Sequence, residues 1–173
     1  NNVYHDFDGA VGGFCTPAYV AANEGHAGVL RILLKAGADP NRIATDPSGW
    51  TPGHAACFNG NAWCVRILLA ANANPGLVTT DRFKYTPCMC AAYNGSVECL
   101  EALHEETSGD TLRINLRSSN LNLNQKYKNQ TALDIAVRRK NEAAANYLRD
   151  TMGGRLTFWS DLTNAQLKQE LKS

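Results

Sequence analysis

Cysteine and histidine are the residues of this 173-residue sequence with the widest chemistry, and it holds six cysteines and four histidines. Both types bind zinc, and a cysteine beside a histidine can act as a nucleophile. Cys88 and Cys90 form a C-x-C pair, but no second cysteine or histidine pair follows at the spacing of a zinc site. We therefore expect no metal site.

Motifs of the common enzyme classes are also missing. The sequence has no G-x-S-x-G, no H-E-x-x-H, no phosphate-binding P-loop and no G-x-G-x-x-G. Carboxylates are plentiful, but none forms a spaced pair in a recognisable cleft motif. We therefore predict no catalytic residue and no cofactor, and we interpret this stretch as non-enzymatic.

Composition narrows the class of protein further. The net charge of +1 gives no strong global field toward nucleic acid or membrane, and the apolar runs are too short to span a bilayer. The apolar fraction of 44% is ordinary for a globular protein. Because the chain opens on Asn1-Asn2, without an initiator methionine or a signal peptide, we expect it to be an excerpt of a longer protein.

The main feature of the sequence is an internal repeat. Its members begin at threonines separated by 35, 35 and 45 residues, and a period in this range is typical of stacked repeat arrays. The four segments are "TPAYVAANEGHAGVLRILLKAGADPN" from Thr16, "TPGHAACFNGNAWCVRILLAANANPG" from Thr51, "TPCMCAAYNGSVECLEALHEE" from Thr86 and "TALDIAVRRKNEAAANYLRD" from Thr131.

Each segment predicts two helices. The threonine is a good N-cap, and the proline after it suits the first helical position. Gly25, Gly60 and Gly95 are expected to end the first helix, because glycine tolerates a left-handed conformation. The second helix shows apolar spacing, as at Leu30 and Leu33. One pair cannot bury its apolar face alone, whereas stacked pairs can.

These units resemble ankyrin repeats. The resemblance rests on Thr-Pro at three of the four starts, on His54 in a T-P-x-H position, on Gly25-His26 and on the G-A-D turn that begins at Gly37. It covers residues 12–151 and implies an all-α solenoid of helix-turn-helix units, with β-turn fingers and an open concave groove. The units depart from the family where Lys84 replaces the glycine that Gly49 supplies two residues before Thr51.

The predicted domain organisation has three parts. Residues 1–15 are an N-terminal extension, and residues 16–151 form the repeat domain, with units starting near 16, 51, 86 and 131. The third unit carries a long loop, 107–120, and loops of this length are often functional. Residues 152–173 form a C-terminal extension with a short helix.

The repeat register also interprets the cysteines and histidines. Cys64 and Cys99 hold equivalent positions, about 10 Å apart in adjacent units, which is too far for a disulfide. We expect them, with Cys57 and Cys88, to be free core residues. Free thiols in this number favour a reducing, intracellular compartment, and we expect the cytoplasm. In the family, imidazole at the positions of His54 and His26 stabilises the local backbone.

The resemblance implies a protein–protein interaction module. Family contacts come from the turns before each threonine and from the exposed ends of the inner helices. Reading those positions gives a predicted partner-binding set rich in aromatic and basic residues, the types enriched in binding hot spots. The set is Pro47, Trp50, Phe58, Asn59, Arg82, Phe83, Tyr85, Tyr93, Asn94, Tyr127, Lys128, Arg138 and Arg139. An alternative is that neighbouring aromatic rings stack on one another and only stiffen the turns.

The distribution of charge along the sequence bears on the charge of the partner. Residues 111–140 have a net charge of +6, whereas residues 1–110 have a net charge of −5. One interpretation of this charge is a solvated helix end plus a polar loop. The other is a basic wall at the C-terminal end of the groove, which would attract an acidic segment of a protein or peptide partner that the sequence does not identify. Two alternatives stay open: weak RNA binding through aromatic and basic side chains, and a substrate-recruiting role for an enzyme outside this stretch or an intramolecular contact with it.

Overall fold

The computed structural model describes residues 15–44, 49–81, 83–107 and 130–153. These residues form helices joined by turns, and they contain no strand, so the all-α prediction is confirmed. The helices come in consecutive pairs: α1 (Pro17–Asn23) with α2 (Ala27–Lys35), α3 (Pro52–Phe58) with α4 (Ala62–Ala70), α5 (Pro87–Asn94) with α6 (Val97–Glu106), and α8 (Ala132–Arg138) with α9 (Glu142–Asp150).

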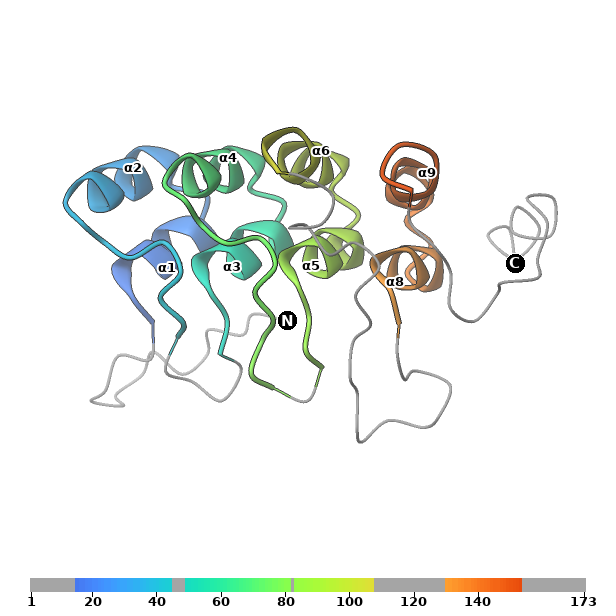
Figure 1. Ribbon diagram of the computed structural model, residues 1–173, viewed down its shortest axis with the longest axis horizontal. Helices are drawn as coiled ribbons and strands as arrows, with labels where there is room; N and C mark the ends of the chain where they lie inside the picture. Colours follow the sequence, from blue (N-terminus) through green and yellow to red (C-terminus); the bar gives the residue numbers. More distant parts are fainter. Residues whose placement is uncertain (1–14, 45–48, 82, 108–129, 154–173) are drawn as a thin grey trace, which may run out of the picture.

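The pairs stack in two layers. Figure 1 shows α1, α3, α5 and α8 side by side in one row, the inner layer, and α2, α4, α6 and α9 in a second row above it, the outer layer. Each inner helix packs against the next inner helix and against its own outer helix. The described parts of the connections from α2 to α3 and from α4 to α5 extend below the inner layer as fingers. The predicted N- and C-terminal extensions and the loop at 107–120 lie almost entirely outside the described residues.

All four threonines cap their inner helices, as predicted. The side-chain oxygens of Thr16, Thr51, Thr86 and Thr131 accept a hydrogen bond from the backbone N–H three residues later, at 3.1–3.3 Å. Each threonine has extended backbone, and in the first three units the following proline begins the helix. The caps therefore set where every inner helix starts.

The buried core contains the cysteines as free thiols. Cys57, Cys64, Cys88 and Cys99 are buried, so their interpretation as core residues is confirmed, and Cys90 is buried as well. A comparison of equivalent positions in the repeats does not reveal one contact between cysteines. The thiol of Cys57 on α3 interacts with that of Cys99 on α6, and this neighbour together with burial raises the pKa of Cys57 above its ordinary value.

Asparagine side chains join consecutive units. Asn61 donates to the carbonyl oxygens of Ala22 and Asn23 at 3.0 and 2.7 Å, at the C-terminus of the preceding inner helix. Asn141 does the same for α5, at 2.9 and 3.0 Å. These carbonyls are among those that a helix leaves without an intrahelical partner.

The expectation for His26 is wrong. His26 holds the same position in unit one as Asn61 in unit two, but its side chain is exposed and makes no capping hydrogen bond. In the described part of the chain no inner helix precedes α1, so the carbonyl groups that this position would cap are missing there. The side chain at this position therefore acts between units and not within one.

We predict that Asn61→Ala lowers the free energy of unfolding by about 2 kcal/mol, because it leaves two partly buried carbonyl groups without their donor. The matched control is His26→Ala, at the equivalent position, which removes no hydrogen bond and is expected to change stability by less than about 0.5 kcal/mol. Urea unfolding followed by circular dichroism measures both. Equal effects of the two substitutions would contradict the inter-unit role of Asn61.

Candidate protein-interaction surface

Aromatic side chains from units two and three form a continuous run, the aromatic run, on the inner layer. The Trp50 and Phe58 rings meet edge to face with centroids 5.0 Å apart, and Phe58 stacks on Tyr93 at 5.3 Å. The Arg139 guanidinium lies 4.1 Å from the Tyr93 centroid, in a cation–π contact. The structure thus brings together four predicted partner-binding residues from three units.

The finger before unit three positions a second group of predicted residues. The Phe83 and Tyr85 rings lie 5.6 Å apart, and Arg138 of α8 reaches the Tyr85 hydroxyl. Burial raises the pKa of Tyr85 above its ordinary value despite the neighbouring guanidinium. The hydroxyl is therefore a neutral hydrogen-bonding group at physiological pH.

One carboxylate holds this finger in shape. Asp81 accepts hydrogen bonds from the Thr79 hydroxyl at 2.7 Å and from the backbone N–H groups of Phe83 and Lys84 at 3.0 and 3.2 Å. Lys84 takes the left-handed conformation, with φ of 53°, at the position where Gly49 has φ of 60°. The Lys84 ammonium donates to the Thr80 carbonyl oxygen at 2.9 Å, so this lysine replaces the family glycine without changing the turn.

Asparagines extend the surface toward unit one. Asn59 donates to the Asn23 side-chain oxygen at 2.6 Å, and Asn23 in turn donates to Glu24 at 2.8 Å. Asn94, the equivalent residue of unit three, is exposed. Pro47, Arg82, Tyr127 and Lys128 lie outside the described residues, so their part in the predicted surface stays a prediction.

The rings of the aromatic run contact one another, as the alternative interpretation of the sequence anticipated. Trp50, Phe58 and Tyr93 are nevertheless half-buried, so part of each ring faces solvent. Stacking therefore fixes the orientation of the rings but leaves them available for contact. The same holds for Phe83 and Tyr85, which are also half-buried.

His54 positions this surface from beneath. Its Nδ1 accepts from the Thr51 backbone N–H at 3.2 Å, which completes a capping box, and its Nε2 lies 2.9 Å from the Tyr85 carbonyl oxygen. Because Nδ1 is an acceptor, Nε2 carries the proton and donates to Tyr85. The ring is fully buried and therefore ties unit two to the finger of unit three. Sequence analysis predicted a local role for His54, and this longer link was missed.

The buried thiols of Cys64 and Cys88 are unsuited to nucleophilic chemistry. Burial raises the pKa of Cys64 to about 11 and that of Cys88 to about 12, so both are protonated at neutral pH. Among the described residues, no group of three or more histidine, cysteine or acidic side chains could hold a metal ion. None of the described helices has the length and apolar character needed to cross a membrane.

We predict that the stability of the protein falls as the pH drops through the titration of His54. Burial lowers the pKa of His54 from 6.5 to about 4, so the native ring stays neutral while the unfolded chain takes up a proton below pH 6.5. The stabilisation is complete above that pH and is lost toward pH 4. Between pH 7 and pH 5 the loss from this one group is about 2 kcal/mol.

The measurement compares urea unfolding of the native sequence with that of His54→Gln at pH 7 and pH 5. Glutamine keeps an acceptor for the Thr51 N–H but does not titrate. The variant is expected to start less stable and to lose about 2 kcal/mol less over this pH interval. An equal loss in both proteins would mean that other groups produce the pH dependence.

Comparison with known proteins agrees with this architecture. A family model described as ankyrin repeats (3 copies) matches residues 5–79 and residues 73–155. No curated protein matches the chain. The family match spans most of the sequence, and its repeat corresponds to the stacked helix pairs of the structure. The chain therefore belongs to the ankyrin repeat family.

Proposed function

We propose that this chain binds a segment of a partner protein across the inner layer of units two to four. Ankyrin repeats are in general protein–protein interaction modules. The observation that carries the proposal is the aromatic run of Trp50, Phe58 and Tyr93, which ends on Arg139. It crosses the boundaries between units and leaves part of each ring exposed.

The stacking of the aromatic rings favours binding, because the rings are already ordered before a partner binds. Each ring is already held by its neighbour, so contact with a partner would cost less side-chain entropy than contact with a free ring. Aromatic side chains supply large contact area, and tyrosine adds a polar hydroxyl. Tyr85 offers such a hydroxyl beside Arg138.

Charge favours an acidic partner segment. Arg138, Arg139 and Lys140 are all exposed at the C-terminal end of α8. The one acidic side chain of that helix, Asp134, is buried and holds the Thr131 backbone N–H in a capping box at 2.8 Å. A carboxylate of the partner would therefore meet basic groups at this end of the aromatic run.

We predict that truncation of an aromatic anchor weakens a partner that binds at this surface. A partner recovered by pull-down from cell lysate is titrated calorimetrically against Trp50→Ala, Tyr85→Ala and Arg138→Glu. Loss of a hot-spot ring is expected to cost about 2 kcal/mol, or about thirtyfold in affinity. Arg138→Glu is expected to slow association and to reduce its salt dependence.

The matched control is Ile32→Ala, which removes an exposed apolar side chain from the outer helix α2 and is expected to leave this binding unchanged. Circular dichroism and urea unfolding confirm that each variant stays folded. A partner that binds all three inner-layer variants as tightly as the native sequence does not use this surface.

A further inference from the structure

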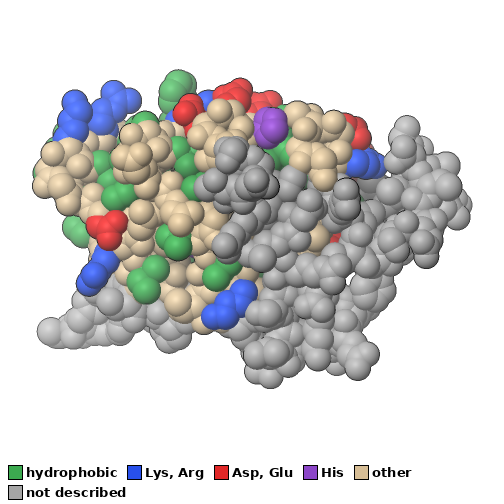
Figure 2. All heavy atoms as spheres, in the orientation of Figure 1, with side chains coloured by type: hydrophobic (Ala, Val, Ile, Leu, Met, Phe, Trp, Pro, Cys, Tyr) green, Lys and Arg blue, Asp and Glu red, His purple; other side chains and the backbone are tan. Residues whose placement is uncertain are grey.

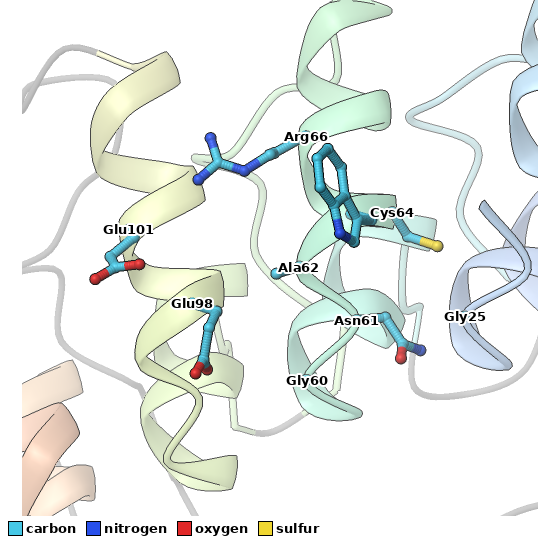
Figure 3. Close-up of a pocket in the computed structure, with 9 residues that line it drawn as sticks. Gly25, Gly60, Asn61, Ala62, Cys64, Arg66, Glu98 and Glu101 are labelled. Atoms are coloured by element: carbon cyan, nitrogen blue, oxygen red, sulfur yellow. The ribbon is translucent and has the colours of Figure 1, made fainter.

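A shallow pocket of ≈ 450 Å³ lies on the outer layer, around the N-terminal half of α4 and the facing side of α6. Its lining includes none of the residues of the aromatic run. Figure 3 shows Glu98 and Glu101 on α6, with Arg66 reaching toward that helix from α4. This pocket is therefore separate from the surface proposed above.

Trp63 forms part of the pocket lining and is 73% exposed. The other side of α4 faces the core with Cys64, Val65 and Leu68, so the helix does not need Trp63 to pack. Trp63 is the most exposed large hydrophobic residue in the described part of the chain. An exposed tryptophan offers a large contact area to a partner, and tryptophan is among the residue types enriched in binding hot spots.

The lining of the pocket has a net negative charge, with Glu98 and Glu101 against Arg66. Glu98 and Glu101 lie three residues apart on α6, where like charges repel and lower helix stability. Figure 2 shows acidic side chains gathered along the top of the molecule, over the outer helices. A cation placed between Glu98 and Glu101 would relieve this repulsion.

The one basic residue of the lining, Arg66, forms its ion pairs outside the pocket, although the charge of Glu101 also acts on it. Arg66 is held by Glu105 at 2.6 Å and by Glu106 at 3.9 Å, beyond the pocket lining. Glu98 accepts only from the Ser96 hydroxyl at 3.2 Å, and neither Glu98 nor Glu101 makes an ion pair with a described residue. Two carboxylates thus flank the pocket with their charges unpaired.

We propose that this pocket is a second docking site, which receives an arginine side chain from a basic segment of a partner protein. The planar guanidinium stacks on aromatic faces and binds carboxylates through paired N–H groups, so Trp63 supplies the ring while Glu98 and Glu101 accept the hydrogen bonds. The chemistry of this partner is opposite to that of the acidic segment proposed for the inner layer. The two layers would therefore hold different segments.

The test titrates the ¹⁵N-labelled chain with the peptide acetyl-Gly-Arg-Arg-Gly-amide and follows NMR shifts, with the Trp63 indole signal assigned from its loss in Trp63→Phe. We expect the peptide to shift that indole signal and the amides around Glu98 and Glu101. The peptide acetyl-Gly-Glu-Glu-Gly-amide is expected to leave them unmoved. Binding of the arginine peptide should weaken as salt is added.

Substitutions test which side chains contact the arginine peptide. Glu98→Gln with Glu101→Gln is expected to lower the affinity about tenfold, and Trp63→Ala about fivefold. Glu142→Gln removes an exposed carboxylate from α9, and Arg139→Ala alters only the inner layer, so neither should change the affinity. Because every substituted side chain is exposed or half-buried, the fold is expected to persist, and circular dichroism checks it.

Three results would overturn the proposal. The first is an arginine peptide that shifts the signals of the inner layer and not that of Trp63. The second is undiminished affinity in the double glutamine variant. The third is a Trp63 signal that depends on protein concentration without any peptide, which would make the patch a contact between copies of the chain. Each result is independent of the test of the inner layer, which uses a different partner and different variants.

Discussion

A helix pair of this protein can bury its apolar side only against another pair, so the structure depends on how closely consecutive pairs approach. Consecutive pairs approach closely where an inner helix ends in a left-handed glycine. A Cβ atom on Gly25 would lie 2.8 Å from the Asn61 side-chain oxygen, and one on Gly95 would lie 2.7 Å from the Asn141 side chain. The asparagines that cap the preceding helices stand at these contacts. The glycine and the asparagine therefore form one close contact between consecutive units. This contact sets the distance between the units and, with it, the spacing of the surface residues that they carry.

The repeat made most of this architecture predictable. Thr16, Thr51, Thr86 and Thr131 cap helices because threonine, proline and glycine act through local backbone geometry, which a sequence pattern records directly. The predicted surface residues were harder to interpret, because exposure of an aromatic ring has two explanations. The structure shows that Trp50, Phe58 and Tyr93 stack on one another and are still only half-buried, so both descriptions apply to the same rings.

What sequence analysis missed depends on contacts between units. The Cys57–Cys99 contact joins non-equivalent positions, and a comparison of equivalent positions cannot find it. His26 was assigned the role of its family position, although that role requires a preceding helix. Trp63 resembled any other residue of an outer helix, and only its 73% exposure beside two unpaired carboxylates singles it out. In each case the missing information was the identity of the neighbour.

Lys140 occupies the position in unit four that Gly25, Gly60 and Gly95 occupy in the others, and it has φ of 61°. Lys140 therefore takes the left-handed backbone conformation, which costs a lysine about 1 kcal/mol relative to glycine. This bears on how such an array can lengthen by gene duplication. A copied unit two or three would carry its own glycine and could accept a neighbour, whereas a unit stacked beyond a copy of unit four would bring its capping side chain against the Lys140 Cβ. Growth of the array past such a unit would require that capping side chain to shift away from the lysine.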